Sequence, residues 1–134
     1  MSNAVVVAGV GMTRFFKPSE SPRYTELGAD AVRMALADAG LAYGAVQQAY
    51  VGYVYGDSTC GQRALYGVGM TGIPVVNVNN NCSTGSTALW LARNAIRAGQ
   101  AECVLALGFE QMQPGALVEH WQDRPGPLDE FVRA

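Results

Sequence analysis

Residues 77–89 read NVNNNCSTGSTAL, and the change from a strand-like to a helix-like pattern within them is the most informative feature of the sequence. The apolar run over 73–78 ends in three asparagines, and Cys82 then opens a long segment with helical periodicity. The pattern predicts a strand over 73–78, a polar turn, and a helix over about 82–98. Apolar residues repeat along that helix at the spacing of one face, namely Ala88, Leu91, Ala92, Ala95 and Ile96.

Further apolar runs lie on both sides of this unit. Residues 5–10 (VVVAGV) and 103–109 (CVLALGF) are apolar without alternation, which predicts strands buried on both faces. Residues 49–55 predict another strand. A short helix is expected over 62–68, and a longer one over 24–39 with Gly40 just beyond its end. The apolar stripe predicted for the longer helix is Leu27, Ala31, Met34 and Ala35.

This alternation of strands and helices predicts an α/β fold. The expected architecture is a mostly parallel mixed sheet with helices on both faces. We expect residues 1–115 to form one domain. Residues 116–134 are rich in proline and glycine, and predict a tail that is a loop or only loosely helical.

Composition narrows the classes of function. The chain has 134 residues and a net charge of -2, with 49% hydrophobic and 15% charged residues. This balance excludes disorder, and the absence of a basic block argues against nucleic-acid binding. No apolar run approaches the ~20 residues that a membrane span requires. The N-terminus also lacks the basic segment with which a secretory signal sequence begins. We therefore expect a cytoplasmic protein, whose low charge suggests that a partner covers much of its surface.

Cysteine and histidine are too few for a disulfide framework or a metal site. The chain has three cysteines, Cys60, Cys82 and Cys103, and a single histidine, His120. No C-x-x-C spacing occurs among them, so free thiols and no metal are expected. His120 is interpreted as a surface residue.

Cys82 is the strongest candidate for chemistry. At the start of a helix a thiol faces free N–H groups and the positive end of the helix dipole, which favour the nucleophilic thiolate and can stabilise an oxyanion. Cys82 could instead be a small residue that simply begins a helix. The polar residues around it favour the nucleophile, and these are Asn79, Asn80, Asn81, Ser83 and Thr84.

Residues 79–86 (NNNCSTGS) resemble the nucleophile segment of the thiolase superfamily, in particular of thiolases of the sterol-carrier-protein-2, or lipid-transfer-protein, type. Three other stretches are similar to the same family: 10–13 (VGMT), 51–63 (VGYVYGDSTCGQR) and 101–110 (AECVLALGFE). The resemblance covers residues 4–115 and implies the N-terminal half of a thiolase fold.

The resemblance implies acyl transfer between coenzyme A thioesters, in fatty-acid or sterol side-chain metabolism. Cys82 would attack an acyl-CoA and carry the acyl group as a thioester, and its own N–H would contribute to the oxyanion site. Met112 matches a family position near the acyl pocket, although it could equally be a flexible core residue. Met112 and Asn81 are the candidate substrate-binding residues. The CoA thioester is a substrate, and no bound cofactor is expected.

The chain also departs from the family pattern. The family's second half supplies a base histidine, an oxyanion histidine and a second cysteine, and His120, Cys60 and Cys103 match none of these. Residues 56–63 resemble a loop at the subunit interface. We therefore expect a homo-oligomer, such as a homodimer, or a second chain that supplies the missing half.

Three alternatives stay open at this point. The chain could be a non-catalytic scaffold or partner subunit, a truncated piece of a longer enzyme, or a subunit of a thiolase-like retro-aldolase for steroid side-chain CoA esters. Gly9-Val10-Gly11 resembles the start of a dinucleotide-binding motif, but Arg14 stands at the third glycine position.

Overall fold

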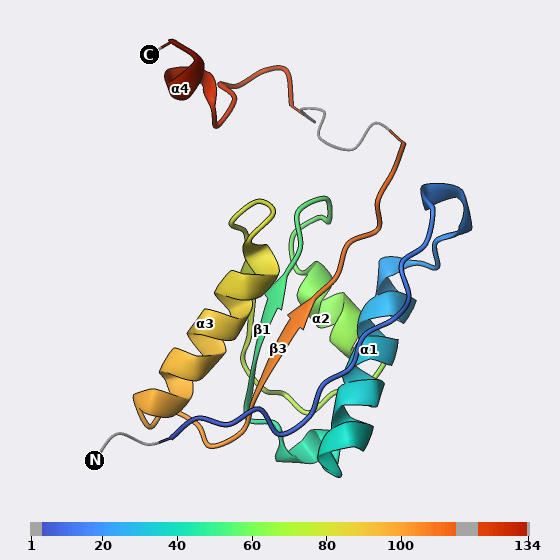
Figure 1. The fold of residues 1–134 in the computed structure, drawn as a ribbon, viewed down its shortest axis with the longest axis vertical. Helices are drawn as coiled ribbons and strands as arrows, with labels where there is room; N and C mark the ends of the chain where they lie inside the picture. The colour runs from blue at the N-terminus through green and yellow to red at the C-terminus, as the bar shows by residue number, and fades with distance from the viewer. Residues whose placement is uncertain (1–3, 115–120, 134) are drawn as a thin grey trace.

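The computed structural model describes residues 4–114 and 121–133. At its centre is a three-stranded parallel sheet in the order β2-β1-β3 (Figure 1). The strands are β1 (Gln48–Gly52), β2 (Val75–Val78) and β3 (Val104–Gly108). Tyr50 of β1 lies opposite Val76 on one side and Ala106 on the other. Because the strands are parallel, all three end at the same edge of the sheet.

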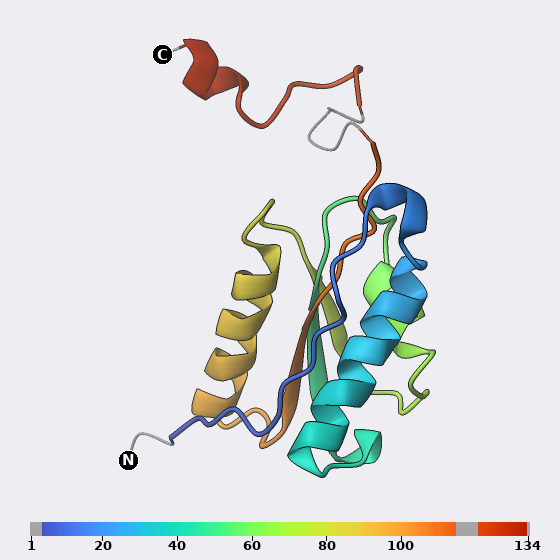
Figure 2. The same ribbon diagram turned by 45° about the vertical axis from the view of Figure 1, so that its right-hand side comes forward.

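Helices cover both faces of this sheet. α3 (Thr84–Arg97) packs on one face, mainly against β1 and β3. α1 (Tyr24–Ala39) and α2 (Cys60–Leu65) pack on the other face, so that Figure 2 shows the sheet between two helical layers. Single turns of 3₁₀ helix at Pro18–Glu20 and Tyr43–Ala45 lie before and after α1. The predicted α/β fold with both faces covered is confirmed.

α3 meets the sheet through small side chains. Ala88, Ala92 and Ala95 are buried on this face, as the apolar periodicity predicted. Leu91 and Ile96 are half-buried beside them. Alanine combines high helix propensity with little bulk, so it allows close contact between helix and sheet.

α1 has the bounds that the sequence predicted, and Gly40 ends it in the left-handed conformation with φ 65°. Its buried residues are, however, Gly28, Ala29 and Val32. The predicted stripe is only half-buried, and Met34 is 46% exposed. The reason is that α1 packs on two sides: one face lies against α2 and the sheet, and the predicted stripe lies under the N-terminal segment.

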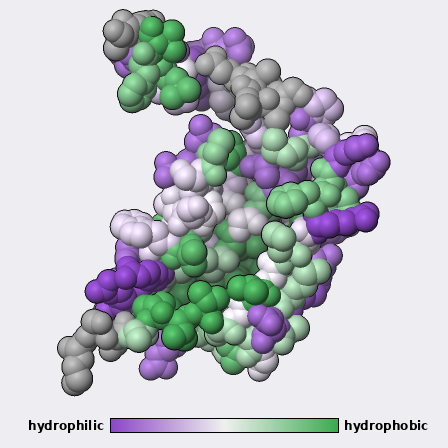
Figure 3. Space-filling model, viewed as in Figure 1, coloured by the Kyte–Doolittle hydropathy of each residue, from purple (hydrophilic) through white to green (hydrophobic). Residues whose placement is uncertain are grey.

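The predicted strand over residues 5–10 is wrong. Val6, Val7 and Val10 are 77%, 71% and 67% exposed, and no strand is assigned there. The segment crosses the molecule as the blue trace of Figure 1, and Figure 3 shows the hydrophobic band on that face. Its backbone packs on α1 at Gly9 and Gly11, where an added Cβ would overlap helix backbone atoms. These two glycines therefore serve contact with a helix.

The described part of the N-terminal segment packs on α1 and does not pair with a strand of the sheet. The Val10 N–H donates to Asp38 Oδ2 at 2.9 Å. A cavity of about 480 Å³ lies between residues 11–16 and the end of β3. Apolar composition identifies a segment that can be a buried strand, but a strand forms only beside a partner with free backbone groups in register.

The remaining elements lie where the sequence predicted them but have different ends, and β3 is a mostly half-buried edge strand where burial on both faces was predicted. β1 and β2 are shorter than predicted, and α2 begins two residues earlier than predicted. α4 (Asp129–Arg133) is a short helix that stands apart from the sheet in Figure 1, and the predicted domain boundary at residue 115 stays a prediction. No helix in the described part of the chain combines the length and the apolar character that a membrane crossing requires.

The core lies between the sheet and the α1–α2 layer. Val32, Val51 and Leu65 are its largest fully buried side chains. Val51, from the central strand, joins the two helices to the sheet. The core thus fixes the carboxyl end of β1, where the loop that leads to α2 begins.

Candidate active site

Cys82 lies in the turn between β2 and α3, at the edge where the parallel strands end. Its thiol is free and its side chain is exposed. The Sγ atom is 3.7 Å from Asn81 Oδ1 and donates a hydrogen bond to it. The structure thus brings together two predicted site residues, Cys82 and Asn81, on an accessible surface.

The helix begins at Thr84, two residues later than the sequence predicted. Cys82 therefore precedes the helix, and the N–H groups nearest to it already have acceptors. Ser83 N donates to Asn80 O at 3.2 Å and Thr84 N donates to Asn81 O at 3.1 Å. The N–H groups of Ser83 and Thr84 therefore close the turn and are not free to stabilise a thiolate or an oxyanion, as a helix start at Cys82 would have allowed.

The polar residues around Cys82 mostly bond to one another. Ser83 Oγ donates to Asn80 O at 2.9 Å, and Asn79 Oδ1 accepts from Asn81 N at 3.2 Å. Thr84 Oγ1 accepts from Asn80 N at 3.0 Å and donates to the Asn81 carbonyl. These bonds account for the polar composition of the turn without requiring a ligand, so the composition alone is weaker evidence for chemistry than the sequence suggested.

Gly52 lets this turn approach the end of β1, and Gly108 lies in ordinary contact with it at the end of β3. An added Cβ on Gly52 of β1 would lie 2.8 Å from the backbone C and O of Thr84. An added Cβ on Gly108 of β3 would lie 3.5 Å from the Gly85 Cα. An added Cβ on Gly85 itself would meet open space. The first turn of α3 therefore rests directly on the ends of β1 and β3.

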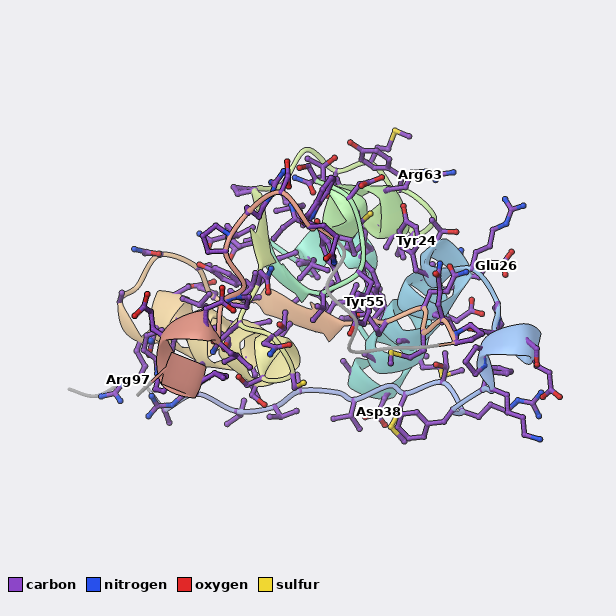
Figure 4. The ribbon with its side chains drawn as sticks, turned by 90° about the horizontal axis from the view of Figure 1, so that it is seen from above. Tyr24, Glu26, Asp38, Tyr55, Arg63 and Arg97 are labelled. Atoms are coloured by element: carbon purple, nitrogen blue, oxygen red, sulfur yellow. The ribbon has the colours of Figure 1, made fainter. Side chains whose placement is uncertain are left out.

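Glu110 ties the loop after β1 to the end of β3. Its two carboxylate oxygens accept the N–H groups of Val54 at 2.8 Å and Tyr55 at 3.2 Å. The loop lines a cavity of about 430 Å³ together with residues from α1 and α2. Figure 4 labels three of the lining residues, Tyr24 of α1, Tyr55 of the loop and Arg63 of α2. Sequence reasoning missed Glu110, because its two partners lie more than 50 residues earlier in the chain.

An aromatic stack supports the same loop. The Phe109 ring lies between those of Tyr24 and Tyr53, with centroid distances of 5.2 Å to each. The Tyr53 hydroxyl accepts from Cys60 N at 3.2 Å and donates to Asp57 O at 2.9 Å. Cys60 is buried at the start of α2 and bonds to the Tyr24 hydroxyl, so its surroundings indicate a structural thiol.

Tyr24→Phe should change the alkaline behaviour of the protein. The hydrogen bond with Cys60, followed by burial, raises the pKa of Tyr24 from 10.0 to about 12. A raised pKa means that the neutral phenol contributes stability below pH 10, which is lost as the pH rises through about 12. We expect wild-type protein to lose more stability than Tyr24→Phe over this interval, measured by urea unfolding.

An absorbance titration of tyrosinate gives a second measurement of the same effect. Tyr24→Phe should lack the phenol that ionises near pH 12, and Tyr66→Phe, at an exposed position, should keep it. Burial also raises the pKa values of Tyr43 and Tyr53, and both variants retain these groups. Identical titrations of wild-type and Tyr24→Phe protein would contradict the prediction.

Met112 lies at a different place from Cys82. It is 38% exposed and lines the cavity of about 480 Å³ between the N-terminal segment and β3, together with Phe16 and Leu27. Neither Cys82 nor Asn81 lines that cavity. The lining is largely apolar, and the role of Met112 in acyl binding stays a prediction.

The other candidates add no second reactive group. Cys103 is half-buried next to β3, and His120 lies outside the described residues. Among residues 4–114 and 121–133, no three His, Cys, Asp or Glu side chains are grouped so that they could hold a metal ion. Cys82 is thus the nucleophile candidate that the described residues offer on an exposed surface.

Comparison with known proteins places these features in a family. Residues 5–125 match the family described as thiolase, N-terminal domain. The chain is 60% identical over 134 residues to sterol carrier protein 2 of Gallus gallus, covering 98% of this chain and 24% of that protein. It is 36% identical over 91 residues to acetyl-CoA acetyltransferase of Pseudomonas aeruginosa, covering 65% of this chain and 23% of that enzyme.

A solved structure agrees at the level of the fold. 3-oxoacyl-[acyl-carrier-protein] synthase III from Aquifex aeolicus aligns with a TM-score of 0.58 at 21% identity, covering 69% of this chain and 31% of that one. The chain therefore spans about a quarter of the length of the relatives that it matches in sequence.

Proposed function

Because the chain belongs to the thiolase family, we propose that it carries the acyl-accepting nucleophile of a thiolase-type acyltransferase, with Cys82 in that role. The observation that carries the proposal is the exposed thiol of Cys82 in the turn between β2 and α3. An acceptor of this kind has to be reachable by a large thioester substrate. Cys60, by contrast, is 7% exposed and bonds to Tyr24.

The proposed step is a thioester exchange. The Cys82 sulfur attacks the carbonyl carbon of an acyl-CoA, a new C–S bond forms, and the carbonyl oxygen becomes an oxyanion. Collapse of this intermediate breaks the bond to the CoA sulfur and leaves the acyl group on Cys82. The proton lost from the Cys82 thiol ends on the CoA thiol, so no oxidant or further reactant is consumed.

The oxyanion would be stabilised by the N–H of Cys82 itself. The N–H groups of Ser83 and Thr84 donate to Asn80 and Asn81, which leaves the Cys82 amide as the proposed donor. The base that takes the thiol proton would come from outside this chain's described residues. We propose that the remaining part of a longer protein, or a second subunit, supplies it.

Substrates from fatty-acid or sterol side-chain metabolism are the proposed class. One relative is named as a sterol carrier protein and another as an acetyl-CoA acetyltransferase, which supports an acyl-CoA with a lipid acyl group. The presence of Cys82 supports acyl transfer over retro-aldol cleavage. The absence of a bound cofactor and the cytoplasmic location stay predictions.

A non-catalytic role is the second candidate. Its support is that the chain's single histidine is His120, which matches no base motif of the family, and that its relative at 60% identity is named for sterol carriage. In that case the chain would contribute structure or an interface to a larger assembly and would not accept acyl groups.

Acylation of Cys82 distinguishes the two candidates. The protein is incubated with acetyl-CoA or palmitoyl-CoA, its intact mass is measured, and the modified peptide is mapped. We expect one acyl group per chain on Cys82, released by hydroxylamine as a thioester requires. Cys82→Ser should lose the adduct, and Cys103→Ser, the matched control at a half-buried cysteine, should retain it.

The opposite result has a clear meaning. A folded wild-type protein that forms no adduct with either thioester would overturn the acyl-acceptor role of this chain. The non-catalytic role would then be the better account.

A further inference from the structure

Thr84 is a buried polar residue next to the nucleophile candidate. Its side chain belongs to the first residue of α3 and it is 4% exposed. Hydroxyl groups are seldom buried without a hydrogen-bond partner, because the loss of water is costly. Thr84 Oγ1 has two, since it accepts from Asn80 N at 3.0 Å and donates to the Asn81 carbonyl.

These two hydrogen bonds join Thr84 to Asn80 and Asn81, the two residues that precede Cys82 in the chain. Asn81 has a φ of 48°, in the left-handed region that residues other than glycine seldom adopt. Asparagine tolerates this conformation better than most residues, but it still needs support from its surroundings. The Asn81 carbonyl accepts from both the hydroxyl and the N–H of Thr84, but only the hydroxyl also accepts from Asn80 N, and the next residue in the chain is Cys82.

The methyl group of Thr84 contacts the sheet. Its Cγ2 lies against Gly52, 2.6 Å from where a Cβ on that glycine would stand. One side chain therefore bonds to the turn through its hydroxyl and packs on the end of β1 through its methyl. Valine keeps the shape and loses the hydroxyl, and serine keeps the hydroxyl and loses the methyl.

We propose that Thr84 is a positioning residue, whose hydroxyl holds Asn81 in the left-handed conformation and so directs the Cys82 thiol and its amide toward an incoming thioester. This inference rests on the proposed acyl-acceptor role of Cys82. Thr84 does not touch the reacting atoms. It acts through the backbone of Asn81, because the φ and ψ angles of Asn81 determine the direction of the next residue, Cys82.

The test compares Thr84→Val and Thr84→Ser in the full chain. Acylation of Cys82 by acetyl-CoA should slow by roughly tenfold or more in Thr84→Val, because misplacement by a fraction of an ångström disturbs attack and oxyanion contact together. Thr84→Ser should restore the rate to within about threefold of wild type. Ser86→Ala, which removes an exposed hydroxyl from the same first turn of α3, is the matched control.

Two further readouts separate positioning from loss of structure. Alkylation of Cys82 by iodoacetamide requires an exposed thiolate but no oxyanion contact, so at a fixed pH its rate should be similar in all variants that retain the wild-type melting temperature. The ¹³C chemical shifts of Asn81 report its backbone conformation, and should leave left-handed values in Thr84→Val but not in Thr84→Ser.

The outcomes are distinguishable. Wild-type acylation rates in Thr84→Val, or equal slowing in Thr84→Ser and Thr84→Val, would overturn the role of the hydroxyl, as would unchanged Asn81 shifts. Alkylation that falls in parallel with acylation would also overturn it, because the effect would then be structural. No acylation of wild-type protein, together with altered Asn81 shifts in Thr84→Val, would overturn the acyl-acceptor function and support Thr84 as the residue that holds the turn.

Discussion

Gly52→Ala is expected to lower the free energy of unfolding by about 3 kcal/mol. The new Cβ would stand 2.8 Å from the backbone C and O atoms of Thr84. Backbone atoms in the first turn of a helix cannot rotate away as a flexible side chain can, so α3 has to shift from the sheet. Contacts of α3 with β1 and β3 would loosen, and Cys82 would move with the helix.

Urea unfolding monitored by circular dichroism measures this loss. Gly44→Ala is the matched control, because an added Cβ there meets nothing within 4 Å and its φ is not positive. We expect the control to stay within about 1 kcal/mol of wild type. A Gly52→Ala protein as stable as wild type would show that the close contact between α3 and β1 is not required.

Glu110→Ala is expected to be destabilising by a similar amount, about 3 kcal/mol. The substitution removes the acceptor of two half-buried N–H groups, those of Val54 and Tyr55. Charge-assisted bonds of this kind are stronger than neutral ones, and the freed donors would lose their partners away from bulk water. The loop that carries Tyr53 and leads to Cys60 would then contact the end of β3 through the Tyr53–Phe109 stack and no longer through Glu110.

Glu110→Gln removes the negative charge of this side chain and keeps its shape. The amide keeps one acceptor oxygen and presents an NH₂ group to the second N–H, so we expect about half of the loss seen with alanine. Glu102→Ala removes an exposed carboxylate near the opposite end of β3 and should change stability by less than about 0.5 kcal/mol. Equal unfolding midpoints for Glu110→Ala and Glu102→Ala would contradict the proposed link between loop and strand.

The sequence was sufficient to predict those elements whose periodicity and end residues lie within or directly beside the element. The bounds of α1 followed from its periodicity and from Gly40, and the alanine face of α3 followed from its spacing. The strand–turn–helix unit around Cys82 was predicted because its apolar run, its asparagines and its helix are consecutive in sequence. The resemblance of residues 79–86 to thiolases pointed to the family that the comparisons then showed.

Residues 5–10 show where local pattern was insufficient. Their apolar composition fits a buried strand, yet a strand also requires a neighbour in register, and here Gly9 and Gly11 place the backbone on α1. The stripe of α1 was misjudged for the same reason, because the N-terminal segment and α2 pack on different sides of it.

An α/β chain with the likeness to thiolases and a cysteine between a strand and a helix could be predicted from sequence, because these properties depend on residues that are close neighbours in the chain. Two contacts became known from the packed structure alone: Thr84 lies against Gly52, and Glu110 accepts the N–H of Val54. Such contacts join atoms through space, many of them distant in sequence. They depend on where the packing of helices on the sheet places each backbone, which no spacing along the chain records.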